Sequence, residues 1–156
     1  MICKRSGIGA ALAAGTLAAG LALAPGAAAV VPQNATIVAD CGLFGGGAAT
    51  LAATQDGTSA TVTVTSSITA PVAIAEDSIA STLTLARASG GTTVFTGTEN
   101  PAMASGESVT VGPLDGTVAA GDSLEAFGGS LRMVVFGITV TCTAEGPQSP
   151  GPFVFE

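Results

Sequence analysis

A strict alternation of small apolar and hydroxyl side chains fills residues 58–65, which read Thr-Ser-Ala-Thr-Val-Thr-Val-Thr. Ala60, Val62 and Val64 fall on one face of an extended chain, and Thr61, Thr63 and Thr65 fall on the other. Residues of this kind in a period of two are typical of a strand with one buried and one solvated face. Residues 58–65 therefore predict a half-buried β-strand.

The same alternation returns along the chain and is divided by turn signals. It recurs over residues 37–41, 79–85, 108–111 and 131–143, and Gly137 interrupts the last of these stretches, where we expect a bulge or a strand covered on both faces. The turn signals are Asp56-Gly57, Ser89-Gly90-Gly91, Ser105-Gly106, Asp115-Gly116, Gly121-Asp122 and Gly128-Gly129. Their spacing predicts an all-β, antiparallel sandwich or barrel of about seven to nine short strands.

The amino end has the three parts of a secretory signal peptide. Lys4 and Arg5 precede an apolar run over residues 8–24, and Ala27-Ala28-Ala29 supplies the small residues of a cleavage site. We expect cleavage after Ala29. An uncleaved membrane anchor is the weaker reading, because a spanning helix needs about 20 apolar residues and this run is shorter and diluted with glycine.

This cleavage divides the chain into a signal peptide (1–29), a β-domain (30–146) and a Pro/Gly-rich C-terminal tail (147–156). Two readings of the tail stay open, since Phe153 and Phe155 fit either a short edge strand or a loose end. The β-domain has the usual size of one domain with its own core.

The part that remains after cleavage is strongly acidic. It holds two cations, Arg87 and Arg132, against eleven carboxylates, so its formal charge is −9. Such a chain repels phosphate backbones and anionic lipid surfaces. We therefore expect no nucleic-acid partner, and no membrane span after cleavage.

Two cysteines, Cys41 and Cys142, remain in the exported part. Two thiols in an oxidising compartment normally pair, so we expect one disulfide that joins the two ends of the domain. A reactive or metal-binding thiol pair is the alternative, but no histidine and no nearby cation is present to activate it.

A family resemblance rests on the first strand with its cysteine, on Val140-Thr141-Cys142-Thr143, on Gly121-Asp122-Ser123-Leu124 and on residues 131–136. This pattern resembles small immunoglobulin-like β-sandwich domains of secreted proteins from high-GC Gram-positive bacteria. The resemblance implies an immunoglobulin-like sandwich and an extracellular location, and it implies no activity. The chain has neither the tryptophan nor the tyrosine of antibody-type domains.

The missing side chains exclude most catalytic chemistry. The chain has no histidine and no tyrosine, and its only lysine leaves with the signal. Ser-His-Asp and Cys-His hydrolysis, Ser-Lys dyads and Schiff-base chemistry therefore have no residues to carry them. We predict that the protein is not an enzyme and needs no cofactor.

Three acidic residues at predicted loops are weak candidates for calcium ligands, because calcium takes carboxylate and carbonyl oxygens. They are Asp56, Asp115 and Asp122. Asp-Gly is first of all a turn former, so turns are the plainer interpretation of Asp56-Gly57 and Asp115-Gly116.

These observations predict a non-catalytic module, secreted or on the cell surface, with a structural or protein-interaction role. Its partners would be envelope or extracellular proteins, bound by strand addition to an exposed sheet edge. The alternative is an extracellular domain that binds a small ligand or calcium.

Overall fold

The computed structural model describes residues 29–156, and the predicted signal sequence up to Ala28 lies outside the described residues. The described part is all-β and antiparallel, with one short 3-10 helix. None of its helices has the length and apolar character that a membrane span requires. The elements are β1 (Asn34–Asp40), η1 (Gly42–Phe44), β2 (Gly46–Asp56), β3 (Ser59–Thr69), β4 (Ala80–Arg87), β5 (Thr92–Gly97), β6 (Ser108–Thr117), β7 (Ser123–Val135), β8 (Ile138–Ala144) and β9 (Phe153–Val154).

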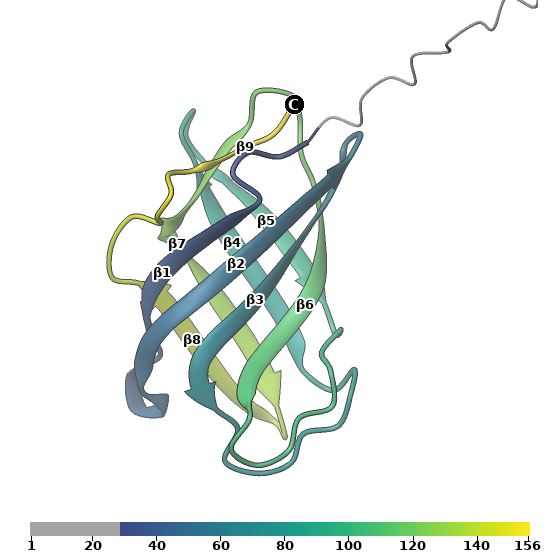
Figure 1. Cartoon of the computed structure of the whole chain (residues 1–156), viewed down its shortest axis with the longest axis vertical. Coiled ribbons are helices and arrows are strands. Elements are labelled where there is room, and N and C mark those ends of the chain that lie inside the picture. Colours follow the sequence, from purple (N-terminus) through teal and green to yellow (C-terminus); the bar gives the residue numbers. More distant parts are fainter. Residues whose placement is uncertain (1–28) are drawn as a thin grey trace, which may run out of the picture.

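The first eight strands close into a barrel. The strand order is β4-β5-β6-β3-β2-β1-β8-β7, and β7 pairs again with β4, so the sheet returns to its start (Figure 1). The predicted immunoglobulin-like sandwich is thereby corrected, because a sandwich has two separate sheets with edges and this sheet is continuous. Alternation along each strand is the same in both architectures, and the two differ in whether the strands form one continuous sheet that closes on itself or two separate sheets.

A glycine pair in the middle of β7 allows this closure. The pairing of β4 with β7 shifts register between Thr84 and Ala86, opposite Gly128 and Gly129. A Cβ atom on Gly129 would collide with the carbonyl oxygen of Thr84, so only glycine fits this approach. Gly128-Gly129 is therefore a bulge that bends β7 around the barrel, and the predicted turn at this site was wrong.

At Gly137 the structure has a turn where the sequence predicted a bulge or a continuous strand. Phe136 and Gly137 have φ angles of 52° and 74°, and Val135 pairs with Ile138 across them. Two successive residues with positive φ make a tight two-residue hairpin turn. The predicted long strand over residues 131–143 is therefore two strands, β7 and β8.

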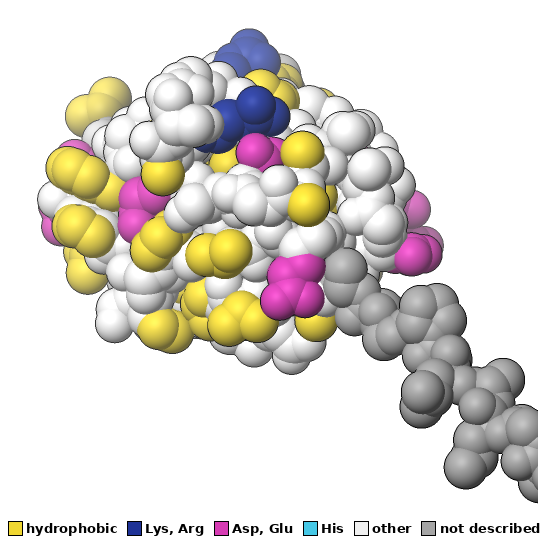
Figure 2. Space-filling model, turned by 90° about the horizontal axis from the view of Figure 1, so that it is seen from above, with side chains coloured by type: hydrophobic (Ala, Val, Ile, Leu, Met, Phe, Trp, Pro, Cys, Tyr) yellow, Lys and Arg dark blue, Asp and Glu magenta, His cyan; other side chains and the backbone are white. Residues whose placement is uncertain are grey.

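Large side chains fill one end of the barrel, which we call the closed end. Phe95, Phe153 and Phe155 are fully buried there, together with Leu85 and Leu124. Strand β9 brings in Phe153 by pairing with the start of β7, so residues 153–154 form the short edge strand that the sequence left open. Figure 2 shows this end from above, with polar and hydrophobic side chains mixed over its surface.

Candidate functional site

An apolar cavity of about 410 Å³ occupies the half of the barrel away from the closed end. Small inward-facing residues leave this space, among them Ala39 on β1, Gly47 and Ala49 on β2, and Ala126 on β7. Leu51 and Leu83 also line it, at the border with the packed core. Because none of the buried phenylalanines of the closed end reaches this half, the small side chains opposite one another enclose a volume.

The chemistry of the lining is almost entirely hydrocarbon. Among the described residues that line the cavity, none carries a charge, and the hydroxyl groups come from Ser66, Thr69, Ser130 and Thr143. The Ser66 hydroxyl already lies 3.3 Å from two backbone carbonyl oxygens, those of Ile68 and Val109. The cavity therefore offers hydrophobic contact and shape, without a converging set of polar groups that would orient a substrate.

The cavity opens between three connections that carry exposed apolar side chains. Phe44 in η1, Val72 after β3, and Phe136 and Ile138 at the β7–β8 turn all line the cavity, although about half or more of each is exposed to solvent. Leu43, next to Phe44, is fully exposed. We call these five residues the mouth rim. Large apolar side chains gathered at an opening mark a binding region more often than scattered ones do.

Phe136 belongs to this rim at a local energetic cost. Its φ of 52° lies in the left-handed region, which glycine and asparagine adopt easily and which costs other residues about 1–2 kcal/mol. Asn-Gly is the favoured pair for such a hairpin turn. A phenylalanine that is 66% exposed contributes little packing in return. A positive φ at an exposed phenylalanine is unusual, and such strained positions often belong to functional sites, which points to a function for this side chain.

Two long connections brace one side of the mouth. Residues 70–79 and 98–107 run side by side at the foot of the barrel in Figure 1, and the backbones of Ile74 and Met103 exchange two hydrogen bonds of 2.8 and 2.9 Å. The buried Asn100 joins them further. Its Oδ1 accepts from the amides of Ser78 and Ile79, and its Nδ2 donates to the carbonyls of Ala75 and Pro101. One side chain thus uses its full hydrogen-bonding capacity to hold the mouth.

Replacing the buried Asn100 by leucine is expected to destabilise the barrel by about 2–4 kcal/mol. The amides of Ser78 and Ile79 and the carbonyl of Pro101 lose their partner, while the Ala75 carbonyl keeps its hydrogen bond from the Ser78 hydroxyl. Urea unfolding followed by circular dichroism measures the change. Asn34→Leu is the control, since Asn34 is exposed and its replacement should change stability by less than about 0.5 kcal/mol. Equal unfolding midpoints for the two variants would contradict the bracing role of Asn100.

The predicted disulfide forms and lies in the cavity wall. Cys41 and Cys142 are bonded, with their Cα atoms 4.0 Å apart, and both line the cavity. They continue the pairing between β1 and β8, which consists only of Ala39 with Ala144 and Asp40 with Thr143. The disulfide therefore reinforces one of the two shortest strand pairings of the barrel, since only β5 with β6 is as short.

The calcium candidates lie apart from the cavity. Asp56 ends β2 and Asp115 lies within β6, so Asp115-Gly116 forms part of a strand where a turn was predicted. Asp122 lies in the β6–β7 loop, where its Oδ2 accepts from the Ala119 amide at 2.9 Å. Within residues 29–156 no three carboxylates or cysteines gather as a group that could hold a metal ion.

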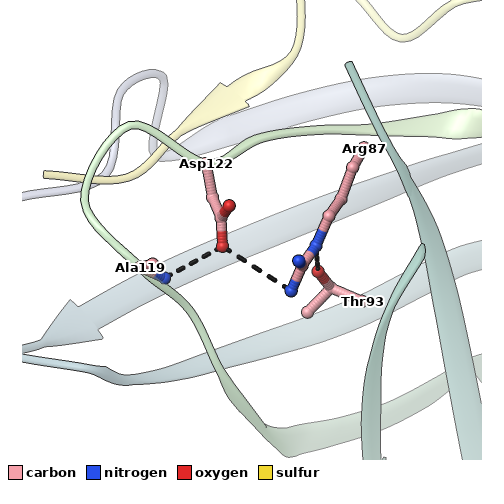
Figure 3. A network of polar contacts seen from close by, with 4 residues as sticks. All are labelled: Arg87, Thr93, Ala119 and Asp122. Carbon is pink, nitrogen blue, oxygen red and sulfur yellow. Dashed lines mark hydrogen bonds and ion pairs between the residues drawn. The ribbon is translucent and has the colours of Figure 1, made fainter. Parts of the chain in front are cut away.

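Asp122 has structural contacts that account for its position. Figure 3 shows its carboxylate facing the guanidinium of Arg87, 3.8 Å from Nη2, while Arg87 Nε donates to the Thr93 hydroxyl at 2.6 Å. The ion pair is partly exposed, so its energetic contribution is small. Together with the Ala119 contact, it fixes the loop between β6 and β7 at the closed end.

The family models, the curated proteins and the solved structures each gave no match to this chain. The candidate site therefore rests on its own geometry. Sequence reasoning missed it, because alanine and glycine at inward positions look like ordinary core residues until the barrel places them opposite one another.

Proposed function

We propose that the protein is an exported, non-catalytic barrel that binds a small apolar molecule in its cavity. The observation that carries the proposal is the cavity of about 410 Å³, whose lining residues carry no charge among those described. Ligand pockets in proteins range over about 300–1,000 Å³, so this volume suits one small molecule. Burial of apolar surface would supply the affinity, at about 25 cal/mol per Å² removed from water.

The closed sheet favours a ligand over a partner bound by strand addition. Strand addition needs a free sheet edge, and each of β1 to β8 has a strand paired on both sides. The interior of a small barrel is, by contrast, a usual place for one small ligand. Calcium has less support, since the three candidate aspartates form no group with other ligands in the described chain.

The location and the absence of catalysis are parts of the same proposal. The signal-like amino end and the disulfide both fit an oxidising compartment outside the cytoplasm. A lining without acids, bases or nucleophilic thiols in free form suits storage or transport of a molecule more than its conversion.

A neutral dye tests the cavity directly. Residues 30–156 contain every strand and every buried core residue of the described chain, so this part is the folded unit to purify. N-phenyl-1-naphthylamine fluoresces more strongly in apolar surroundings, and its titration should give a saturable increase with one site. Ala49→Leu adds three carbon atoms inside the cavity and should weaken dye binding at least about tenfold, with little change in stability because there is room for them.

Ala53→Leu is the matched control on the same strand and the same face. Ala53 is 2% exposed and lies in the packed core outside the cavity lining. The added carbons should overpack the core there and destabilise the barrel by about 1–3 kcal/mol, while the folded variant binds the dye normally. Unchanged dye binding by Ala49→Leu, or no saturable binding by the parent protein, would refute the proposal.

A further inference from the structure

We propose that the mouth rim inserts into the surface of an electrically neutral lipid bilayer, so that the apolar ligand passes between bilayer and cavity without entering water. This inference rests on the proposed function, since it names the source of the ligand. A molecule that suits a hydrocarbon-lined cavity dissolves poorly in water and concentrates in lipid. A barrel that collects such a molecule gains by opening directly onto the lipid.

The rim has the composition that insertion requires. Its side chains come from three separate connections, residues 41–45, 71–74 and 136–138, and none of these segments contains a charged residue. Apolar and aromatic side chains of this kind are stable at the boundary between headgroups and acyl chains. The same residues line the cavity, apart from Leu43, so inserted tips would connect the cavity with the acyl region.

The conformation of Phe136 supports a role outside the barrel. Its positive φ holds the ring at the tip of the β7–β8 hairpin, where it is 66% exposed. Asparagine would suit this backbone better, so neither the turn nor the core accounts for the phenylalanine. Insertion into lipid gives the exposed ring an apolar environment.

The charge of the protein indicates which lipid is involved. The exported part carries −9, and Glu76, Asp77 and Glu107 lie on the two long connections at the mouth end. An anionic surface would repel these groups, whereas the mouth rim is uncharged and needs no opposite charge on the lipid. A zwitterionic bilayer such as phosphatidylcholine is therefore the expected surface. A second copy of the chain is a poorer occupant, because three separate tips around an opening offer no flat face to a copy of themselves.

Vesicle flotation tests the inference with two matched double variants. Purified residues 30–156 are mixed with phosphatidylcholine vesicles, and with vesicles in which phosphatidylglycerol replaces part of the phosphatidylcholine. Leu43→Ser/Phe136→Asn removes two apolar side chains from the rim and gives the hairpin its favoured Asn-Gly turn. Val94→Ser/Phe127→Ser removes two apolar side chains that are about half exposed on the outer barrel wall.

The parent protein and the wall variant should float with phosphatidylcholine vesicles, and the rim variant should bind at least about tenfold more weakly. Binding should decrease as phosphatidylglycerol increases. Dye binding without vesicles separates this inference from the proposed function. If the parent binds the dye but does not float, lipid docking is refuted and the cavity function stands.

Four other results would also overturn the inference. Equal loss of flotation in the wall variant would show that no particular surface is involved. Tighter binding to phosphatidylglycerol vesicles would contradict the charge argument. A dimer in sedimentation velocity that the rim variant abolishes would assign the rim to a second copy of the chain. If the parent binds neither the dye nor the vesicles, both the inference and the proposed function are refuted.

Discussion

Replacing both Cys41 and Cys142 by serine is expected to lower the free energy of unfolding by about 4–5 kcal/mol. The two residues are 101 positions apart, and closing so long a loop restricts the unfolded chain strongly. The bond also lies where β1 and β8 share only two residue pairs, so it helps to hold these two strands together in the native barrel. Loss of the bond should therefore loosen the wall of the cavity before the rest of the barrel.

Two measurements check both parts of this expectation. Urea unfolding, followed by circular dichroism, gives the loss of stability, and hydrogen exchange gives its distribution along the chain. The amides of β1 and β8 should lose protection first, while those of β3 and β6 keep theirs longer. Reduction of the parent protein should reproduce the behaviour of the serine variant. An unchanged urea midpoint after reduction would show that the disulfide adds no stability.

Phe153→Ala should destabilise the barrel by about 3–5 kcal/mol, as large-to-small changes of buried phenylalanines do. Phe153 has no exposed surface and lies in the main core, although only three residues follow it in the sequence. Its removal leaves a hole at the closed end, where the backbone of β9 is held by only two residue pairs with β7 and one bridge to Val31.

Val154→Ala is the matched control from the neighbouring position. Val154 is 43% exposed, so its truncation should change the unfolding free energy by about 0.5 kcal/mol or less. Thermal and urea unfolding of the two variants measure the difference. Similar stabilities would mean that the C-terminal segment is an appendage, and that the closed end is sealed by Phe95 and Leu124 alone.

Period-two alternation predicted the strands with the most β-branched residues. It located β1, β3, β4 and β6, and it covered β7 and β8 as one stretch. Neither β2 nor β5 is among the strands that it predicts. In β2 the run Gly46-Gly47-Ala48-Ala49 has low strand propensity, and pairing with β1 and β3 on both sides overrides that local preference.

The half of the barrel that holds the candidate site was harder to predict, and the reason is physical. The disulfide follows from counting the cysteines that remain after the predicted signal peptide. The cavity depends on what is missing from the interior, since Ala39, Ala49 and Ala126 enclose space only when barrel closure sets them around a common axis. Closure in turn depends on the bulge at Gly128-Gly129, which the sequence presents as an ordinary turn signal.

The hydrogen bonds between Val31 and Val154 bring the first and last described segments together. Both ends of the folded unit therefore emerge on the side opposite the opening, as Figure 1 shows. A tag, a fluorophore or a tether joined to either end therefore leaves the cavity opening unobstructed. The same proximity means that a short peptide could link the old termini, so that new ones can be cut elsewhere in the sequence without rearranging the fold.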